Sequence, residues 1–224
     1  MSADVITSIV TPAASYNLVT LAQVKLELGI PSNDTTDDQY LNQKISSISA
    51  LVSKYCNRPF VTETYQDIYL PDRGIEPFHS IGRFRPLQLT NWPVQSISSI
   101  VVAPGPTSAS NETLTEGVDF VLNNRPGQVI RYSETTGLPC SWQPYPTTIV
   151  YVAGYATIPA DLVDQLLALI AGKYQTKGIN PMTKRTNQPG GIGEIEYWVP
   201  NSPQGAFPPS VQEVLDLYRV PVNS

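Results

Sequence analysis

The chain has 224 residues, of which only 15% are charged, and its formal net charge at pH 7 is −5. This size is enough for one domain, or for a body with a subdomain, around a hydrophobic core. Such a charge balance argues against a protein that grips duplex DNA, because neutralising phosphates requires clustered Lys and Arg. No apolar run is long enough to span a bilayer, and no secretory signal precedes the first expected helix, so we expect a cytoplasmic protein with no membrane contact.

Two helices are predicted near the N-terminus, over residues 20–29 and about 36–57. Each starts with a Thr that has a Gln three residues later, which is the spacing of a capping box, at Thr20 and at Thr36. In the second segment apolar residues recur at intervals of three and four, so one face of that helix is expected to lie on a core.

Two more helices are predicted near the C-terminus, over residues 159–178 and 210–218. The first of these has a broad apolar stripe that includes Leu166 and Ile170, which predicts a central helix with both side chains buried. Its first turn is acidic and its last turn basic, as the helix dipole favours.

Between these helical parts the periodicity changes to that of strands. Turn-forming clusters separate five candidate strands, at residues 65–70, 95–102, 118–122, 128–132 and 147–153. The third and fourth are joined by a short turn and are predicted to form a hairpin.

The predicted fold is therefore α+β. Residues 1–58 and 159–224 are expected to form a helical body of about four helices, and residues 59–158 an inserted, small antiparallel β subdomain. Residues 176–209 are expected to form an extended arm of the helical body, because a connection this long is uncommon inside a compact domain.

The arm carries a basic pair and an alternating apolar and aromatic run. We expect it to contact a neighbouring subunit or a partner through these residues: Lys184, Arg185, Ile195, Tyr197, Trp198 and Val199. The alternative is a hairpin that folds back on its own body. The alternation at residues 195–199 suits either an added strand or an internal one.

No catalytic residue, cofactor site or metal site can be named from the sequence. His79 is the single histidine, which excludes a His-based metal pair. The acidic pair Asp37 and Asp38 could contribute to a cation site, but a helix N-terminus is the simpler interpretation. The second pair, Glu194 and Glu196, is better explained as a solvated strand face.

Four segments together resemble one known family. They are VTLAQVKLELGI at 19–30, YCNRPF at 55–60, VYVAGY at 150–155 and PPSVQEVLDLYR at 208–219. Their order and spacing are similar to those of phage head–tail connector proteins, also called head-completion or adaptor proteins. The loops of the insert and the arm depart from that pattern.

The resemblance implies a non-enzymatic virion protein that forms a ring, typically a dodecamer, in the phage neck. Such a ring docks on the portal protein, extends the DNA channel and offers a surface to a tail-side neck or tail-terminator protein. It is assembled in the bacterial host cytoplasm, and DNA passes through it without sequence-specific binding. Tyr218 and Arg219, at the C-terminal end of the matching pattern, join the arm residues as expected interface positions.

Two other functions stay open at this point. Another ring-forming neck or tail protein, such as a tail terminator, would be built on a sheet core with few helices. An enzyme or a small-molecule binding module would need a concave pocket with converging polar groups.

Overall fold

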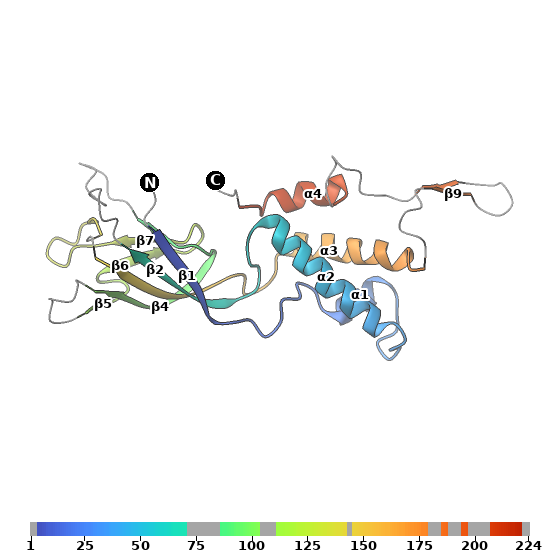
Figure 1. Cartoon of the computed structure of the whole chain (residues 1–224), viewed down its shortest axis with the longest axis horizontal. Helices are drawn as coiled ribbons and strands as arrows, with labels where there is room; N and C mark the ends of the chain where they lie inside the picture. The colour runs from blue at the N-terminus through green and yellow to red at the C-terminus, as the bar shows by residue number, and fades with distance from the viewer. Residues whose placement is uncertain are drawn as a thin grey trace. The chain divides into compact units, whose positions relative to one another are not determined.

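The computed structural model describes residues 4–70, 86–103, 111–142, 145–178, 185–187, 194–196 and 207–220. The chain divides into two compact units (Figure 1). The sheet unit consists of Met1–Ser15 and Pro59–Thr157, and the helical unit of Tyr16–Arg58 and Ile158–Ser224.

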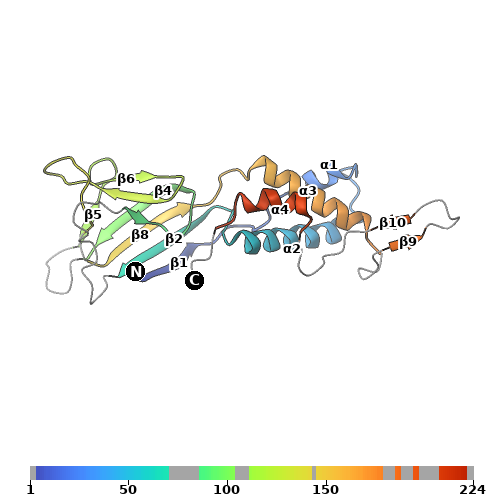
Figure 2. The same ribbon diagram turned by 90° about the horizontal axis from the view of Figure 1, so that it is seen from above.

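The sheet unit contains a five-stranded antiparallel sheet in the order β1-β2-β8-β4-β5 (Figure 2). Its strands are β1 (Asp4–Thr11), β2 (Glu63–Leu70), β8 (Thr147–Ala153), β4 (Val94–Val102) and β5 (Glu112–Leu114). Buried residues alternate with more exposed ones along β2 and β8, so one face of the sheet lies on a core.

A second, three-stranded sheet has the order β3-β7-β6. It is formed by β3 (Leu87–Gln88), β7 (Gln128–Arg131) and β6 (Phe120–Asn123). β6 and β7 pair in antiparallel register, which confirms the predicted hairpin. Residues of both sheets share one hydrophobic cluster that includes Tyr65, Ile149, Phe120 and Val129, so the two sheets enclose a common core.

The helical unit contains α1 (Leu21–Glu27), α2 (Asp38–Cys56), α3 (Ala160–Gln175) and α4 (Pro209–Asp216). α2 and α3 contact each other, and α1 and α4 each contact both of them. Leu166 and Ile170 of α3 are fully buried, as predicted for a central helix. On α2, which contacts α3, three apolar residues are also fully buried: Leu41, Ile45 and Val52. The α+β class with four helices and antiparallel sheets is confirmed by the described residues.

The helix ends follow local chemistry. Thr20 caps α1 with the predicted box, in which its hydroxyl accepts from the Gln23 amide and the Gln23 side chain accepts from the Thr20 amide. α2 ends at Cys56 and is followed by Asn57, which adopts the left-handed conformation with φ of 50°. The amide of Arg58 then donates to the Ser53 carbonyl at 3.2 Å, the bond that closes a Schellman turn.

Within the long connection between α3 and α4, β9 (Arg185–Asn187) pairs with β10 (Glu194–Glu196) in antiparallel register. They form a two-stranded sheet and pair with no other strand that the structure describes. None of the described helices is both long and apolar enough to cross a membrane.

The structure corrects the sequence analysis at three places. Residues 1–58 do not all join the helices, because β1 belongs to the sheet unit. The capping box at Thr36 is absent: Asp37 precedes α2 and its side chain makes no cap bond. The strand expected at 118–122 is displaced to Phe120–Asn123, with Val118 exposed in the preceding turn.

Candidate interaction surfaces

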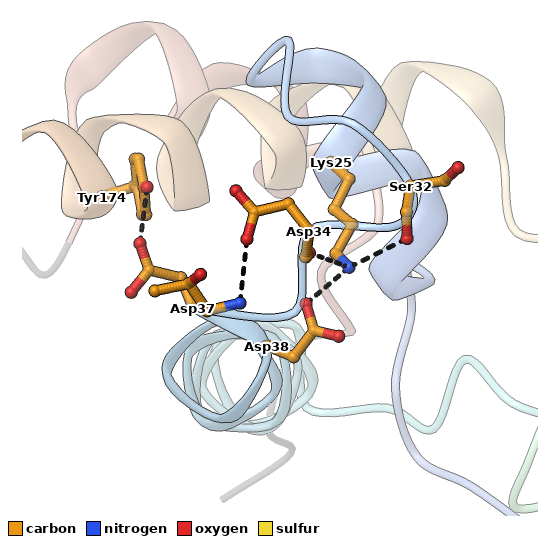
Figure 3. Close-up of polar contacts among 7 residues, drawn as sticks. Lys25, Ser32, Asp34, Asp37, Asp38 and Tyr174 are labelled. Carbon is orange, nitrogen blue, oxygen red and sulfur yellow. Dashed lines mark hydrogen bonds and ion pairs between the residues drawn. The ribbon is translucent and has the colours of Figure 1, made fainter.

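The loop between α1 and α2 is fastened by a buried lysine (Figure 3). Lys25 of α1 is only 6% exposed, and its ammonium lies 2.6 Å from Oδ1 of Asp38 at the start of α2. The same ammonium donates to the carbonyls of Asp34, at 2.7 Å, and Ser32, at 3.5 Å. A buried charge is tolerated only when paired and hydrogen-bonded, and this arrangement provides both.

A second contact joins the start of α2 to the end of α3. The Asp37 carboxylate accepts from the Tyr174 hydroxyl at 2.7 Å and pairs with the Lys177 ammonium. The hydrogen bond from Lys177, followed by that from Tyr174, lowers the pKa of Asp37 below its ordinary value. In return, Asp37 raises the pKa of both Tyr174 and Lys177.

The two acids that could have formed a cation site are thus occupied by lysines of the chain itself. Asp38 pairs with Lys25, and Asp37 pairs with Lys177. Among the residues that the structure describes, no group of three or more His, Cys, Asp and Glu could hold a metal ion. His79 lies outside the described residues.

The C-terminal helix is held by aromatic and polar contacts with α2. The Tyr55 hydroxyl donates to Asp216 at 2.7 Å, and its ring meets that of Phe207 edge-on, with centroids 5.2 Å apart. Burial, followed by the hydrogen bond to Asp216, raises the pKa of Tyr55. Buried Cys56 contacts the Leu215 carbonyl, and burial raises the pKa of its thiol to about 11.

The two predicted interface residues after α4 lie close to this contact. The half-buried Tyr218 donates its hydroxyl to Asp161, with 2.7 Å to Oδ1 and 2.8 Å to Oδ2, and so ties the end of α4 to the start of α3. Arg219 is exposed, and its guanidinium lies over the Tyr55 ring at 5.3 Å from the centroid. Tyr218 therefore has a role inside the subunit, while Arg219 faces solvent.

Strand β1 forms one edge of the main sheet, as Figure 2 shows. It pairs with β2 and with no other strand in the described part of the chain. Residues 5–11 of the strand are all exposed. Its four large apolar side chains, which lie on both faces of the strand, are between 37 and 54% exposed: Val5, Ile6, Ile9 and Val10.

A buried carboxylate fastens this edge strand. Asp67 of β2 is fully buried and accepts from the Thr7 hydroxyl of β1 at 2.7 Å. Its other oxygen accepts from the Thr90 amide at 2.9 Å and the Tyr151 hydroxyl at 3.0 Å. Burial and the Asp67 charge raise the pKa of Tyr151, so its hydroxyl stays a donor. A second buried acid of β2, Glu63, accepts from the Ala13 amide at 3.2 Å.

The predicted arm is described only in part. Arg185 lies in β9 and Ile195 in β10, so the structure brings the segments that carry them together in one hairpin. Lys184, Tyr197, Trp198 and Val199 lie outside the described residues.

Sequence reasoning missed β1 and its anchor. The sequence did contain a signal for this strand: Val, Ile and Thr dominate residues 4–11, and such β-branched residues favour strands. Nothing in the sequence links Thr7 to Asp67, since the two residues meet only through the pairing of β1 with β2.

A comparison with protein families finds a match over the N-terminal helices. Residues 18–77 match the family described as phage gp6-like head–tail connector protein. This match covers α1, α2 and β2, and it confirms the resemblance to head–tail connectors that the helical motifs suggested. A comparison with curated protein sequences gives no significant match.

Solved structures extend the likeness over nearly the whole chain. A chain in the virion of a native gene transfer agent particle matches with a TM-score of 0.55, at 14% identity and with 97% of each chain covered. A chain in the neck of an empty gene transfer agent particle, computed with C6 symmetry, matches with a TM-score of 0.52 at the same identity and coverage. At this identity the likeness establishes a shared fold.

Proposed function

We propose that this chain is a structural protein of the neck of a tailed phage or phage-like particle, acting as a ring-forming head–tail connector. The observation that carries the proposal is the family match at residues 18–77, which falls on the helices α1 and α2. The fold shared along 97% of the chain with a chain from a gene transfer agent neck supports it independently.

The finer parts of the proposal concern assembly. We expect the helical unit, built from Tyr16–Arg58 and Ile158–Ser224, to be the connector body, with the sheet unit as its accessory domain. The resemblance implies a dodecamer, and the C6 symmetry of the matched neck is compatible with rings of six or twelve subunits. One face of the ring would dock on the portal and the other would offer the tail-side attachment surface, in a virion assembled in the host cytoplasm.

The charge of the chain suits a channel through which DNA passes. Only 14 of 224 residues are Lys or Arg, and the net charge is −5. Each lysine or arginine contact with a phosphate releases counterions and holds the duplex in place. A connector that must let DNA slide benefits from having few such contacts.

The alternatives gain no support from the described residues. A tail terminator would be built on a sheet core with few helices, whereas the described residues include a separate unit of four helices. As to catalysis, Asp67 and Asp37 each accept a structural hydrogen bond from a tyrosine hydroxyl, as detailed above.

Mass measurement and imaging of the purified protein test the proposal directly. In negative-stain images we expect the purified protein to form rings, either alone or after mixing with the portal protein. Native mass spectrometry should give a multiple of six subunits. A protein that stays monomeric and leaves the portal unbound at every concentration would contradict the proposed function.

Two variants test the predicted partner residues. Reversing both charges at Lys184 and Arg185 to Glu should weaken portal docking while the melting temperature stays unchanged. Deleting residues 188–204 should leave a folded, soluble protein that no longer enters the neck. Loss of folding in the deletion variant would mean that this segment belongs to the core of its own subunit.

A further inference from the structure

We infer that the free edge of β1 is the acceptor for the β9–β10 hairpin of a second copy of this chain, so that neighbouring subunits are joined by strand addition. This inference rests on the proposed ring and names the surfaces that would hold it together. It is drawn from two features of the described residues: a sheet edge that pairs with no further strand, and a hairpin that joins no larger sheet.

The acceptor is a complete strand with one side unused. β1 is eight residues long, and its register with β2 is regular from Asp4 to Ile9. In the described structure its second side meets no other strand, so it presents a row of backbone N–H and C=O groups. Exposed edges of this kind add strands from other chains.

Natural edge strands are commonly blocked by bulges, charges or proline. The opposite edge of the sheet is blunted: its edge strand β5 has only three residues, and β4 beside it has two register shifts, between Val94 and Ser96 and between Ile97 and Ser99. β1 has a single shift, between Ile9 and Thr11 at its end, and its one charged residue is Asp4. The middle of β1 is therefore open to pairing.

The exposed side chains of β1 also favour a partner. Ile6 points to one face of the sheet, and Val5 and Ile9 to the other, since alternate residues of a regular strand face opposite sides; Val10 lies at the register shift. All four are more than a third exposed. A strand added at this edge would cover part of each face and remove apolar surface from water.

The strand is also held in place before any partner arrives. The Thr7 hydroxyl is bound to Asp67, and the Ala13 amide, just beyond the strand, is bound to Glu63. Both acceptors are almost fully buried in β2. An edge that is already ordered loses little conformational freedom on binding, which favours association.

The hairpin is the matching donor. β9 and β10 have three residues each and pair only with one another among the described strands. A two-stranded sheet is marginal in water and gains stability when it joins a larger sheet. It lies within the 28 residues that separate Gly178 from Phe207, and a loop of that length can extend about 45 Å out and back.

Cysteine cross-linking distinguishes the possible pairings. All variants carry Cys140→Ser, since Cys140 is partly exposed, whereas Cys56 is buried and has a raised pKa. One preparation carries Ser8→Cys on β1 and the other Ile195→Cys on β10; after mixing, assembly and mild oxidation, we expect a disulfide between residues 8 and 195 of different copies. The matched control replaces Ser8→Cys with Thr113→Cys, an exposed position on β5 at the opposite edge of the sheet, and should not cross-link.

A second variant pair tests the same contact without cysteines. Ile6→Lys with Val10→Lys places charge on the acceptor edge and should raise the concentration needed for half-assembly about tenfold or more, with an unchanged melting temperature. The control, Val118→Lys with Val121→Lys, alters exposed apolar residues elsewhere on the sheet unit and should assemble like the parent.

The outcomes separate the inference from the proposed function. If the parent forms rings but residue 195 cross-links to residue 113, or to neither position, the inference is overturned and the ring stands. A chain carrying both Ser8→Cys and Ile195→Cys that cross-links within the diluted monomer would also overturn it. If the parent forms no ring and binds no portal, the proposed function fails before any cross-link is read.

Discussion

The two units each fasten a peripheral segment with a nearly buried charged group, but they do so with different chemistry. In the helical unit, Lys25 holds the loop before α2 through an ion pair with Asp38 and two carbonyl oxygens. In the sheet unit, Asp67 holds β1 and the Thr90 amide through neutral donors. The first anchor pairs opposite charges, and the second surrounds one charge with dipoles.

This difference predicts how each segment responds to its surroundings. Ion pairs near the surface weaken as salt is added, and they titrate when either partner changes its protonation state. A buried carboxylate satisfied by hydroxyl and amide donors is screened far less. The edge strand should therefore keep its position under conditions that loosen the more exposed ion pair of the helical unit, between Asp37 and Lys177.

The largest expected effect lies in the helical core, where no polar anchor contributes. Leu166→Ala removes a fully buried side chain from α3 and should lower the free energy of unfolding by about 2–5 kcal/mol. Urea denaturation measures the change. Leu169→Ala, on a more exposed face of the same helix, is the control and should cost clearly less. Equal midpoints for parent and Leu166→Ala would contradict the central role of α3.

The second largest loss of stability is expected when the buried Asp67 carboxylate of the sheet unit is replaced. The Asp67→Asn substitution replaces a carboxylate, whose two oxygens both accept hydrogen bonds, by an amide, whose nitrogen can only donate. At least one of the three donors, Thr7, Thr90 and Tyr151, therefore loses its acceptor. We expect a loss of about 1–3 kcal/mol in the free energy of unfolding. Hydrogen exchange should also become faster in β1.

The control for this variant is Asp4→Asn, which changes the one acidic residue of β1 itself. It should leave both stability and exchange within experimental error of the parent. If Asp4→Asn and Asp67→Asn behave alike, the network around Asp67 does not anchor the edge strand.

The corresponding test in the helical unit removes the buried lysine, Lys25, from its ion pair with Asp38. Lys25→Met keeps much of the side-chain volume but leaves the Asp38 carboxylate without its cation, and should cost about 1–3 kcal/mol by urea denaturation. Lys54→Met, at an exposed position of α2, should change stability by less than about 0.5 kcal/mol. If Lys25→Met together with Asp38→Asn restores none of the loss, the pair is not the source of the effect.

Local signals in the sequence were enough to predict the four helices and the hairpin of β6 and β7. The capping box at Thr20 was predicted correctly because both of its members lie within one turn. The same reasoning was wrong at Thr36, because Asp34 accepts from the Thr36 amide and the contacts of Asp37 with α3 set the start of α2 instead. Those contacts join residues 137 and 140 positions apart, which a local pattern does not contain.

The proposed interface could be predicted from the sequence only in outline. Alternation at residues 195–199 suggested a strand, and the structure places Ile195 in β10. The edge that could receive it depends on β1, whose place in the sheet follows from pairing with a strand about 60 residues away. Tyr218 was predicted as an interface residue, although its hydroxyl contact with Asp161 ties α4 to α3 within the subunit.

The smallest expected effect is that of the exposed ion pair between Asp37 and Lys177, whose contribution to stability depends on pH and on salt. The pKa of Asp37 is lowered in the folded state, so its contribution to stability is present above the unfolded pKa of about 3.9 and is lost as pH falls through the lower, folded value. The pKa of Lys177 is raised, so its contribution is present below about 10.4 and is lost as pH rises further. Asp37→Asn should therefore melt slightly below the parent over a flat range around neutral pH.

The difference between Asp37→Asn and the parent should shrink in acid and in strong base, and also as salt is added at neutral pH, because this pair is exposed to solvent. Scanning calorimetry across pH at two ionic strengths measures it. Asp164→Asn, on an exposed position of α3, serves as the control. Asp67→Asn measured beside it should keep its full deficit when salt is raised. If the deficits of Asp37→Asn and Asp67→Asn respond to salt in the same way, the buried Asp67 network is screened no less than the exposed pair of Asp37 and Lys177, and this contrast between the units is wrong.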